Sequence, residues 1–306
     1  MPRGTSTPWT RPSVRPTPTP RNLASSSTPG PSSGTRKRVP GTRSTNSQQG
    51  DQIVTDRTDS VFVITGSAAG IGRAIALRAA RGGARVVVNS RKAEKLDQVT
   101  KEIEDAGGEA LAVGADLRDP EQVDTLVQRT LERWQRIDVL VNNAAGRFLA
   151  AAEQISPGGW RAVVEANLTT AFLCSRAVFP VFRERGGGRI INISSVGAYG
   201  PNPGGAHYGA AKAALNSLTE TLAYEWGRYG IQVNGVAPGP VLTEASRYAQ
   251  EEQRRLVEAK LPGGRIAMPD EIAEFVLSLA QLRTPYLNGE TVRVDGALRG
   301  MLHDEP

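Results

Sequence analysis

The sequence predicts a single α/β domain, built on a doubly wound parallel sheet of seven strands with helices on both faces. Two observations lead to this fold class. From residue 60 onward, short apolar runs rich in β-branched residues alternate with longer helix-like segments, which is the pattern of a parallel sheet covered on both faces. No internal repeat interrupts the series. Residues 51–306 are therefore predicted to form one domain.

The first apolar run, residues 61–65, ends in a glycine-rich turn. Its residues are β-branched or aromatic, which suits a strand buried on both faces. Gly66 frees the backbone for a sharp turn, while Gly70 and Gly72 permit close approach of a diphosphate or of the next helix. A helix predicted over residues 71–81 points its unpaired N–H groups back at this turn. The stretch predicts an anion cradle, with a glycine-rich turn that binds nothing as the alternative.

The other elements follow in alternation. Six more strands are predicted at residues 85–89, 110–113, 139–142, 189–194, 232–237 and 291–294. Further helices are predicted to begin near residues 92, 120, 157, 205 and 269. Pro120 and Pro269 are each followed by an acidic residue, which suits a first helical turn. The charged segment 244–265 departs from the alternation, and it is interpreted either as a substrate lid at the carboxyl edge of the sheet or as a solvated surface helix.

The first fifty residues differ in composition from the rest of the chain. They are rich in Thr, Pro, Ser and Gly, contain no acidic residue and carry eight of the 37 basic residues. The rest of the chain has 29 basic and 31 acidic residues, so the net charge of +6 comes from the first fifty residues. The net charge therefore does not indicate a nucleic-acid-binding fold. Residues 1–50 are predicted to be disordered. An extended translation start or functionless tail is favoured, and an organelle transit peptide and a basic nucleic-acid-binding arm are the alternatives.

Composition also argues against several kinds of site. The chain has two histidines, His207 and His303, which are too few for a convincing His-based metal site or Ser–His–Asp triad. No metal is predicted. Cys174 is the single cysteine and lies in an apolar helical stretch, where a buried core residue is expected. No apolar run long enough to span a bilayer is predicted, and no membrane association is expected. The expected location is the cytoplasm, with organelle targeting by residues 1–50 left open.

The strongest candidates for chemistry lie between residues 194 and 212. Tyr208 and Lys212 are spaced four apart in a helix-compatible run, so their side chains share one face. A nearby ammonium favours the phenolate and is expected to lower the pKa of Tyr208 from about 10, as suits a proton donor to a nascent alkoxide. Ser195, at the end of the fifth strand, can donate to the same substrate oxygen. Taken alone, Tyr208 and Lys212 could also be an ordinary surface pair.

The ends of the second, third and fourth strands suggest the cofactor. Ser90 and Arg91 stand where an acidic residue would bind a ribose diol, and an arginine accommodates a 2′-phosphate instead. NADP(H) is therefore preferred and NAD(H) is the alternative, unless Arg91 only begins a solvated helix. Asp116 can accept from an adenine amino group or cap a turn. The small residues around Asn143 and Ala144 leave room for a ligand.

Taken in order, the motifs Thr65-Gly-x-x-x-Gly-Ile-Gly72, Asn142-Asn-Ala, Ser195 and Tyr208-x-x-x-Lys212 resemble those of the short-chain dehydrogenase/reductase superfamily. The resemblance covers roughly residues 58–298. It implies a Rossmann-type domain and hydride transfer between a nicotinamide and a carbonyl or alcohol carbon. The catalytic residues it implies are Asn167, Ser195, Tyr208 and Lys212. The cofactor contacts it implies are Gly66, Ser67, Gly70, Ile71, Gly72, Ser90, Arg91, Asp116, Leu117, Asn143, Ala144, Tyr208, Lys212, Pro238, Gly239, Val241 and Thr243.

Within the superfamily, the intact tyrosine and lysine favour an enzyme similar to 3-oxoacyl-carrier-protein reductases. The stretches 142–148, 156–160 and 225–230 look like those of 2,4-dienoyl-CoA reductases, which tend to lack the tyrosine. An enoyl- or dienoyl-thioester reductase is therefore the first alternative, and a catalytically silent dinucleotide-binding module is the second. The expected partner is a small carbonyl or acyl-thioester substrate and not nucleic acid. The resemblance also implies a homo-oligomer, either a tetramer or a dimer.

Overall fold

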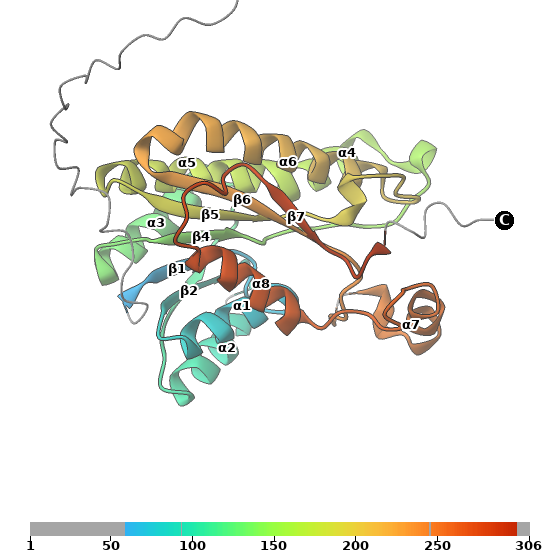
Figure 1. Ribbon diagram of the computed structural model, residues 1–306, viewed down its shortest axis with the longest axis horizontal. Helices are drawn as coiled ribbons and strands as arrows, with labels where there is room; N and C mark the ends of the chain where they lie inside the picture. Colours follow the sequence, from blue (N-terminus) through green and yellow to red (C-terminus); the bar gives the residue numbers. More distant parts are fainter. Residues whose placement is uncertain (1–58, 93, 245, 299–306) are drawn as a thin grey trace, which may run out of the picture. The chain divides into compact units, whose positions relative to one another are not determined.

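The computed structural model describes residues 59–92, 94–244 and 246–298, so the predicted disorder of residues 1–50 lies outside the described residues. In these ranges, seven strands form one parallel sheet in the order β3-β2-β1-β4-β5-β6-β7 (Figure 1). The strands are β1 (Val61–Ile64), β2 (Arg85–Ser90), β3 (Glu109–Gly114), β4 (Val139–Asn142), β5 (Gly188–Ile193), β6 (Ile231–Pro238) and β7 (Thr291–Val294). The predicted doubly wound sheet is confirmed.

The strand order reverses between β1 and β4. From β1 the chain moves outward to β2 and β3, then returns to β4 and moves outward in the other direction to β7. Ile64 pairs with Val141, so the two central strands end side by side. Ligands of open α/β sheets bind outside the carboxyl ends of the strands at such a reversal. The strand order therefore locates the candidate site at the ends of β1 and β4.

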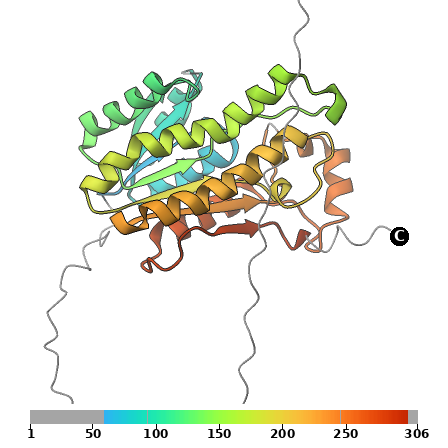
Figure 2. The same cartoon turned by 90° about the horizontal axis from the view of Figure 1, so that it is seen from above.

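Helices cover both faces of the sheet. Figure 1 shows one set below the strands and another above them, and Figure 2 shows two of the upper helices, α5 and α6, side by side. The lower set is α1 (Gly70–Arg81), α2 (Glu94–Asp105) and α8 (Pro269–Gln281). The upper set is α3 (Pro120–Trp134), α4 (Pro157–Val164), α5 (Thr170–Glu184) and α6 (Ala206–Trp226). The predicted helix starts agree with these bounds to within two residues.

Each face of the sheet has its own hydrophobic core. All four residues of β1 are buried. Phe62 and Ile64 belong to the core that also holds Ile75 of α1, whereas Val63 belongs to the core that holds Phe182 of α5. Successive side chains of a strand point to opposite faces, so a strand covered on both sides must be apolar throughout. This is why the alternation of apolar runs and helices predicts the fold.

One helical run, Pro157–Glu184, is long and apolar enough to cross a membrane by length and composition alone. This corrects the expectation that no run reaches that length. In the fold, the run consists of α4, a π-helical turn and α5, and it packs on the sheet through Leu173, Val178 and Phe182. Core helices of soluble proteins pass the same test, so the run is weak evidence for a membrane span.

The segment after β6 contains a 3-10 turn (Arg247–Ala249) and the short helix α7 (Glu251–Glu258). It lies beyond the carboxyl edge of the sheet (Figure 1). The helix α7 has no buried residue. After α7, the side chains of Leu261 and Ile266 are again buried. Both interpretations of residues 244–265, lid and surface helix, stay predictions.

Candidate active site

The turn between β1 and α1 passes directly against the loop after β4. Gly66 has φ +63°, and a Cβ added to it would lie 2.9 Å from the Cα of Ala144. A Cβ on Gly72 would lie 2.4 Å from both Asn143 Nδ2 and the carbonyl oxygen of Gly66. Only glycine fits at either position without movement of the backbone. The two central loops therefore meet at the reversal of strand order.

Polar contacts hold these two loops together. Asn143 Nδ2 donates to the carbonyls of Thr65 and Gly66 at 3.0 and 3.1 Å. Thr65 Oγ1 accepts from the main-chain N–H groups of Asn143 and Ala144, both at 2.9 Å. The helix α1 begins here with no side chain capping its first turn and no acidic residue in that turn. Its free N–H groups and dipole fit the diphosphate of a dinucleotide.

The turn after β6 reaches the same place. A Cβ on Gly70 would lie 3.2 Å from Thr243 Cγ2, so the glycine-rich turn and this turn touch. Pro238 is the last residue of β6, and the N–H of Gly239 bonds to β7. Val241 has its side chain in a hydrophobic core. Of the predicted contacts after β6, Thr243 thus reaches the site, whereas the side chain of Val241 is buried and Val241 is paired with Ala267.

Three other predicted cofactor contacts direct their side chains into the fold. Ser67 is fully buried, and its hydroxyl donates to the carbonyl of Ile64 at 2.9 Å and accepts from the N–H of Asn89 at 2.8 Å. Leu117 is buried in one core, and Ile71 packs partly buried against the other. These side chains stabilise the turns. Their roles as cofactor contacts stay predictions.

The ends of β2 and β3 carry charged groups. Arg91 is exposed, and Ser90 Oγ accepts from the N–H of Lys92 at 3.2 Å. The carboxylate of Asp116 accepts from Arg118 Nε at 2.9 Å, and this bond holds the pKa of Asp116 at about 2, with the charge of Arg91 acting in the same direction. Sequence reasoning had not singled out Arg118, although its spacing of two residues from Asp116 is a detectable signal. Asp116 is ionised and paired at this edge.

Ser195, Tyr208 and Lys212 come together as predicted. Lys212 Nζ lies 5.8 Å from the centroid of the Tyr208 ring, and the side chain of Ser195 lies close enough to Tyr208 to act toward a lower pKa of the phenol. The helix α6 carries Tyr208 and Lys212 one turn apart. Ser195 follows β5, and its Oγ accepts from the N–H of Gly197 at 3.1 Å. A strand end and a helix therefore fix the three groups relative to one another.

The protonation of this group differs from the sequence prediction. Lys212 is fully buried, its Nζ donates to the carbonyl of Ile193 at 2.7 Å, and burial lowers the pKa of Lys212 to about 7. The pKa of Tyr208 is raised by burial, while Ser195 and the charge of Arg147 act to lower it. The expectation that Lys212 depresses the pKa of Tyr208 is wrong for this structure, because burial disfavours the charged lysine and its ammonium points at a carbonyl.

Asn167 lies in the π-helical turn (Glu165–Thr169) between α4 and α5. Its side chain is buried, and Nδ2 donates to the carbonyls of Gly146 and Val163 at 2.6 and 2.8 Å. The turn packs against α6, the helix of Tyr208 and Lys212. Single π-helical turns are frequent at functional sites because they interrupt the regular helical bonds. The sequence predicted the residue, but not the change of helix type.

A buried polar chain lies beneath the site. Asn192 Oδ1 accepts from Asn142 Nδ2 at 2.8 Å, and Asn192 Nδ2 donates to Thr219 Oγ1 at 2.8 Å. Asn142 Nδ2 also donates to Ser175 Oγ at 3.0 Å. The four side chains connect β4, β5, α5 and α6. Sequence reasoning missed this network, although an asparagine stands in each of two strands that are mostly apolar.

Cys174 and His207 lie outside the predicted catalytic residues, and both are buried. Cys174 is a core residue as predicted, and burial raises the pKa of its thiol to about 12. His207 lies fully buried with its ring edge-on to Phe148, the centroids 4.4 Å apart. Within the described residues, neither nitrogen of His207 has a hydrogen-bond partner, and no cluster of three or more His, Cys, Asp or Glu side chains could hold a metal ion.

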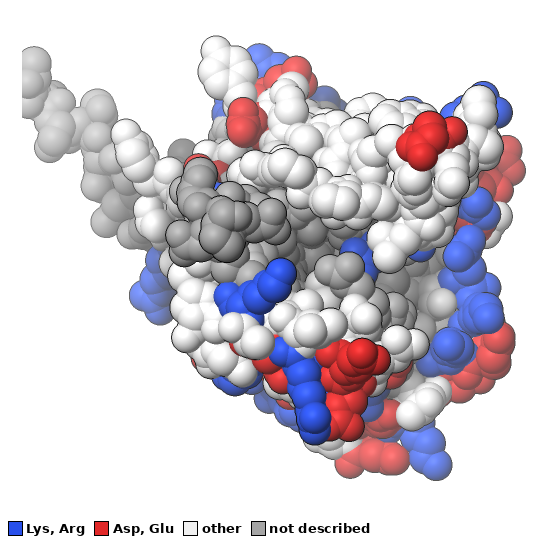
Figure 3. Space-filling model, turned by 90° about the vertical axis from the view of Figure 1, so that its right-hand side faces the viewer, with Lys and Arg blue, Asp and Glu red and all other residues white. Residues whose placement is uncertain are grey.

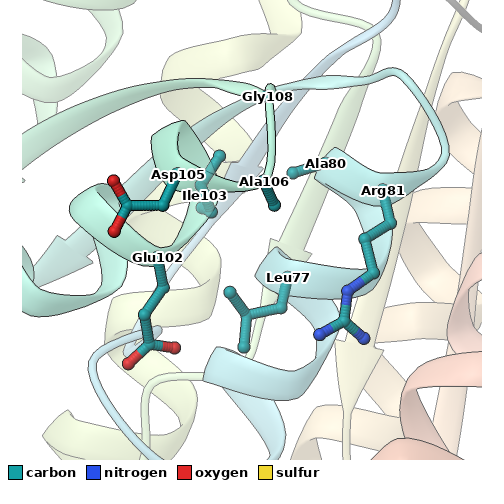
Figure 4. A pocket seen from close by; sticks show the side chains of 8 residues that line it. All are labelled: Leu77, Ala80, Arg81, Glu102, Ile103, Asp105, Ala106 and Gly108. Atoms are coloured by element: carbon teal, nitrogen blue, oxygen red, sulfur yellow. The ribbon is translucent and has the colours of Figure 1, made fainter.

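The carboxyl edge of the sheet faces the viewer in Figure 3. The surface there is hollowed, with mostly uncharged side chains above the hollow and charged ones below and beside it. A separate hollow of about 360 Å³ lies between the C-terminal ends of α1 and α2, at the opposite edge of the sheet (Figure 4). Its lining residues are Leu77, Ala80, Arg81, Glu102, Ile103, Asp105, Ala106 and Gly108. No predicted site residue lines this second hollow.

Comparisons with known proteins fit this geometry. A family model described as enoyl-(acyl carrier protein) reductase matches residues 66–298. A 3-oxoacyl-[acyl-carrier-protein] reductase from Synechocystis sp. is 39% identical over 247 residues, which cover 80% of this chain and 99% of that protein. A Bacillus subtilis protein described as a 2,4-dienoyl-CoA reductase is 36% identical over 239 residues, covering 76% and 94%. The crystal structure of a variant of the actinorhodin polyketide ketoreductase with NADPH has a TM-score of 0.76 at 34% identity, covering 80% and 99%.

These matches span the whole described domain and nearly the full length of the relatives. The glycine-rich turn, the loop after β4 and the Ser195, Tyr208 and Lys212 group lie at one edge of a doubly wound sheet. The chain therefore belongs to the short-chain dehydrogenase/reductase family, whose members are NAD(P)-dependent oxidoreductases that act on carbonyl or alcohol groups.

Proposed function

We propose that the protein is an NADP(H)-dependent ketoreductase that converts the 3-oxo group of an acyl thioester into a secondary alcohol. The observation that carries the proposal is the meeting of Ser195, Tyr208 and Lys212 beside the glycine-rich turn. The 3-oxoacyl reductase from Synechocystis supports an acyl-thioester substrate.

A nicotinamide cofactor supplies the hydride when it is bound. Gly66, Gly70 and Gly72 would hold its diphosphate at the N-terminus of α1, where a Cβ would collide with neighbouring loops. Lys212 would bind the nicotinamide ribose, and Thr243 would contact the nicotinamide from the turn after β6. The residues at the reversal of strand order therefore fit this cofactor.

The protein's own groups handle the proton. Tyr208 donates its phenolic proton to the substrate oxygen, and Ser195 donates a second hydrogen bond to that oxygen and orients it. Because burial raises the pKa of Tyr208, the phenol is protonated near neutral pH, which is the form that reduction requires. Lys212, with a pKa of about 7, can take up and release a proton near neutral pH and so restore Tyr208. Asn167 would complete the relay to solvent.

The preference for NADP(H) rests on Arg91. Arg91 is exposed at the end of β2, close enough for its charge to act on Asp116. No described residue forms a hydrogen bond or ion pair with its guanidinium. A free guanidinium at this strand end suits a 2′-phosphate, whereas a ribose diol would call for an acidic residue.

An enoyl- or dienoyl-thioester reductase is the second candidate. The B. subtilis relative and the description of the family model favour it. The intact Tyr208 argues for carbonyl reduction, since a phenol beside Ser195 suits protonation of an oxygen.

A homo-oligomer, tetramer or dimer, is also part of the proposal. Trp160, Phe172 and Tyr224 are exposed on α4, α5 and α6, and large apolar side chains in such positions favour an interface. Light scattering that gives the mass of a monomer would refute it. The cytoplasmic location stays a prediction.

The proposed reaction is tested with a substrate panel. Purified protein is mixed with NADPH and, in turn, an acetoacetyl thioester, a simple ketone and a dienoyl thioester, and the loss of NADPH absorbance is followed. Turnover of the acetoacetyl thioester is expected. Turnover of the dienoyl thioester alone would favour the second candidate, and NADPH binding without any turnover would establish a silent module.

A further inference from the structure

Arg147 contacts the ring of Tyr208 but has no part in the proton transfer proposed for Tyr208, Ser195 and Lys212. Its guanidinium carbon lies 5.6 Å from the centroid of the Tyr208 ring. Arg147 comes from the loop after β4, far from Tyr208 in the sequence. The distance falls within the range over which a cation is attracted to an aromatic ring.

The neighbours of Arg147 hold its loop in place on both sides. The carbonyl of Gly146 accepts from Asn167 Nδ2 at 2.6 Å. On the other side, the ring of Phe148 packs edge-on against buried His207 at 4.4 Å between centroids. The backbone of Arg147 is thus anchored to the π-helical turn and to the first turn of α6. Such anchoring supports a defined position for the guanidinium over the phenol.

The other groups around Tyr208 do not supply an equivalent charge. On the same helix, the ammonium of Lys212 donates to a carbonyl and is itself disfavoured by burial. The neighbouring His207 packs against an aromatic ring, and Ser195 is neutral. On the π-helical turn, the charge of Glu165 acts on Arg118. Within the described residues, Arg147 has no acidic partner that would neutralise it.

We propose that Arg147 is a positioning residue that stabilises the ionised form of Tyr208 and so sets the pH range in which the enzyme transfers a proton. A positive charge near a phenol favours the phenolate, and the effect of Arg147 on Tyr208 has this direction. Lys212 then takes part in the proton relay and binds the cofactor, while Arg147 adjusts the ionisation of Tyr208, which is the acid. The inference rests on the proposed function in assigning Tyr208 as the proton donor.

The direct test follows the ionisation of Tyr208 without substrate. NMR of isotope-labelled tyrosine in the full-length protein reports each phenol, and the Tyr208→Phe variant assigns the signal. Arg147→Gln is expected to raise the pKa of Tyr208 by roughly half a unit to one unit. Arg147→Lys should retain most of the wild-type value. An unchanged Tyr208 titration in Arg147→Gln would overturn the inference.

Arg228→Gln is the matched control. The guanidinium carbon of Arg228 lies 4.8 Å from the centroid of the Tyr229 ring, beyond the far end of α6. The variant removes the same charge from the same kind of contact, outside the site. It should leave the titration of Tyr208 unchanged, and an equal shift in both variants would show a general charge effect and overturn the inference.

Kinetics gives the second readout. Alcohol oxidation requires ionised Tyr208, so the ascending limb of kcat/KM against pH should move upward in Arg147→Gln by the same roughly half to one unit. If Arg147→Gln raised KM but left the ascending limb of kcat/KM at the same pH, Arg147 would be a substrate contact only. This result would overturn the inference. Absence of turnover in the wild type would refute the proposed function, whereas the substrate-free titration would still decide the role of Arg147.

Discussion

The buried ammonium of Lys212 donates to the main-chain carbonyl of Ile193 across 2.7 Å. The contact joins α6 to the last residue of β5, directly before Ser194 and Ser195. A lysine in this position is held by one carbonyl in surroundings that otherwise favour its neutral form. Lys212 therefore carries a cost in stability that depends on pH.

Lys212→Met is expected to remove this pH dependence. In the folded protein, the pKa of Lys212 is lowered from 10.5 to about 7, so between these values the unfolded chain binds more protons. The stability of the wild type relative to the variant should therefore rise with pH across this window, by no more than about 5 kcal/mol. Below pH 7 Lys212 destabilises the fold by the full amount, and above pH 10.5 this destabilisation is gone.

Urea unfolding of the cofactor-free proteins at several pH values measures this difference. Lys101→Met, at an exposed position on α2, is the control and should run parallel to the wild type. Parallel curves for the wild type and Lys212→Met would contradict the prediction.

Tyr208→Phe should lower kcat for carbonyl reduction by roughly 100- to 10,000-fold, because it removes the proton donor and keeps the ring. NADPH binding, measured by fluorescence, should change little. The control is Tyr224→Phe, the same substitution on the same helix at a side chain that is 91% exposed. Equal losses in the two variants would mean that Tyr208 is not the acid.

Arg91→Glu should weaken the preference for NADPH over NADH by roughly 10- to 1,000-fold in kcat/KM, since it replaces a cation at the 2′-phosphate with an anion. Lys101→Glu makes the same change of charge at an exposed position on the following helix. The ratio of kcat/KM values for the two cofactors is the measurement. An unaltered ratio in Arg91→Glu would show that Arg91 only begins a solvated segment.

Gly72→Ala should destabilise the protein by roughly 1–3 kcal/mol and weaken NADPH binding. Alanine normally stabilises a helix by about 1 kcal/mol relative to glycine, but a Cβ here would lie 2.4 Å from Asn143 Nδ2 and from the Gly66 carbonyl oxygen. Gly158→Ala, in the first turn of α4, is the control, because its nearest neighbour would be 3.9 Å away. Thermal unfolding and NADPH titration of both variants test the prediction, which a stabilised Gly72→Ala variant would contradict.

The sheet was predictable because each of its central strands is covered on both faces and must be apolar. Residues 61–64 are all buried in the structure, and Gly66 and Gly72 are required because a Cβ there would lie 2.4 to 2.9 Å from neighbouring atoms. Pattern and composition suffice for such features. The grouping of Ser195, Tyr208 and Lys212 was also predictable, since helical spacing and the parallel topology bring them to one edge.

Other features depend on tertiary packing and could not be predicted from local pattern. The π-helical turn at Asn167 interrupts a run that reads as one regular helix. The protonation of Tyr208 and Lys212 follows from burial, which spacing alone does not reveal. The position of Arg147 over Tyr208 arises because two separate segments anchor its loop.

The buried network of hydrogen bonds through Asn142, Asn192 and Thr219 connects β4, β5 and α6 beneath the proposed proton-transfer groups. The segment that carries α7 lies outside this network, and α7 has no buried residue. The part of the molecule that supports the proposed proton transfer is then separate from a segment that can change without disturbing it. Directed evolution toward new substrates should accumulate substitutions in α7, while both asparagines and Arg147 persist through every round.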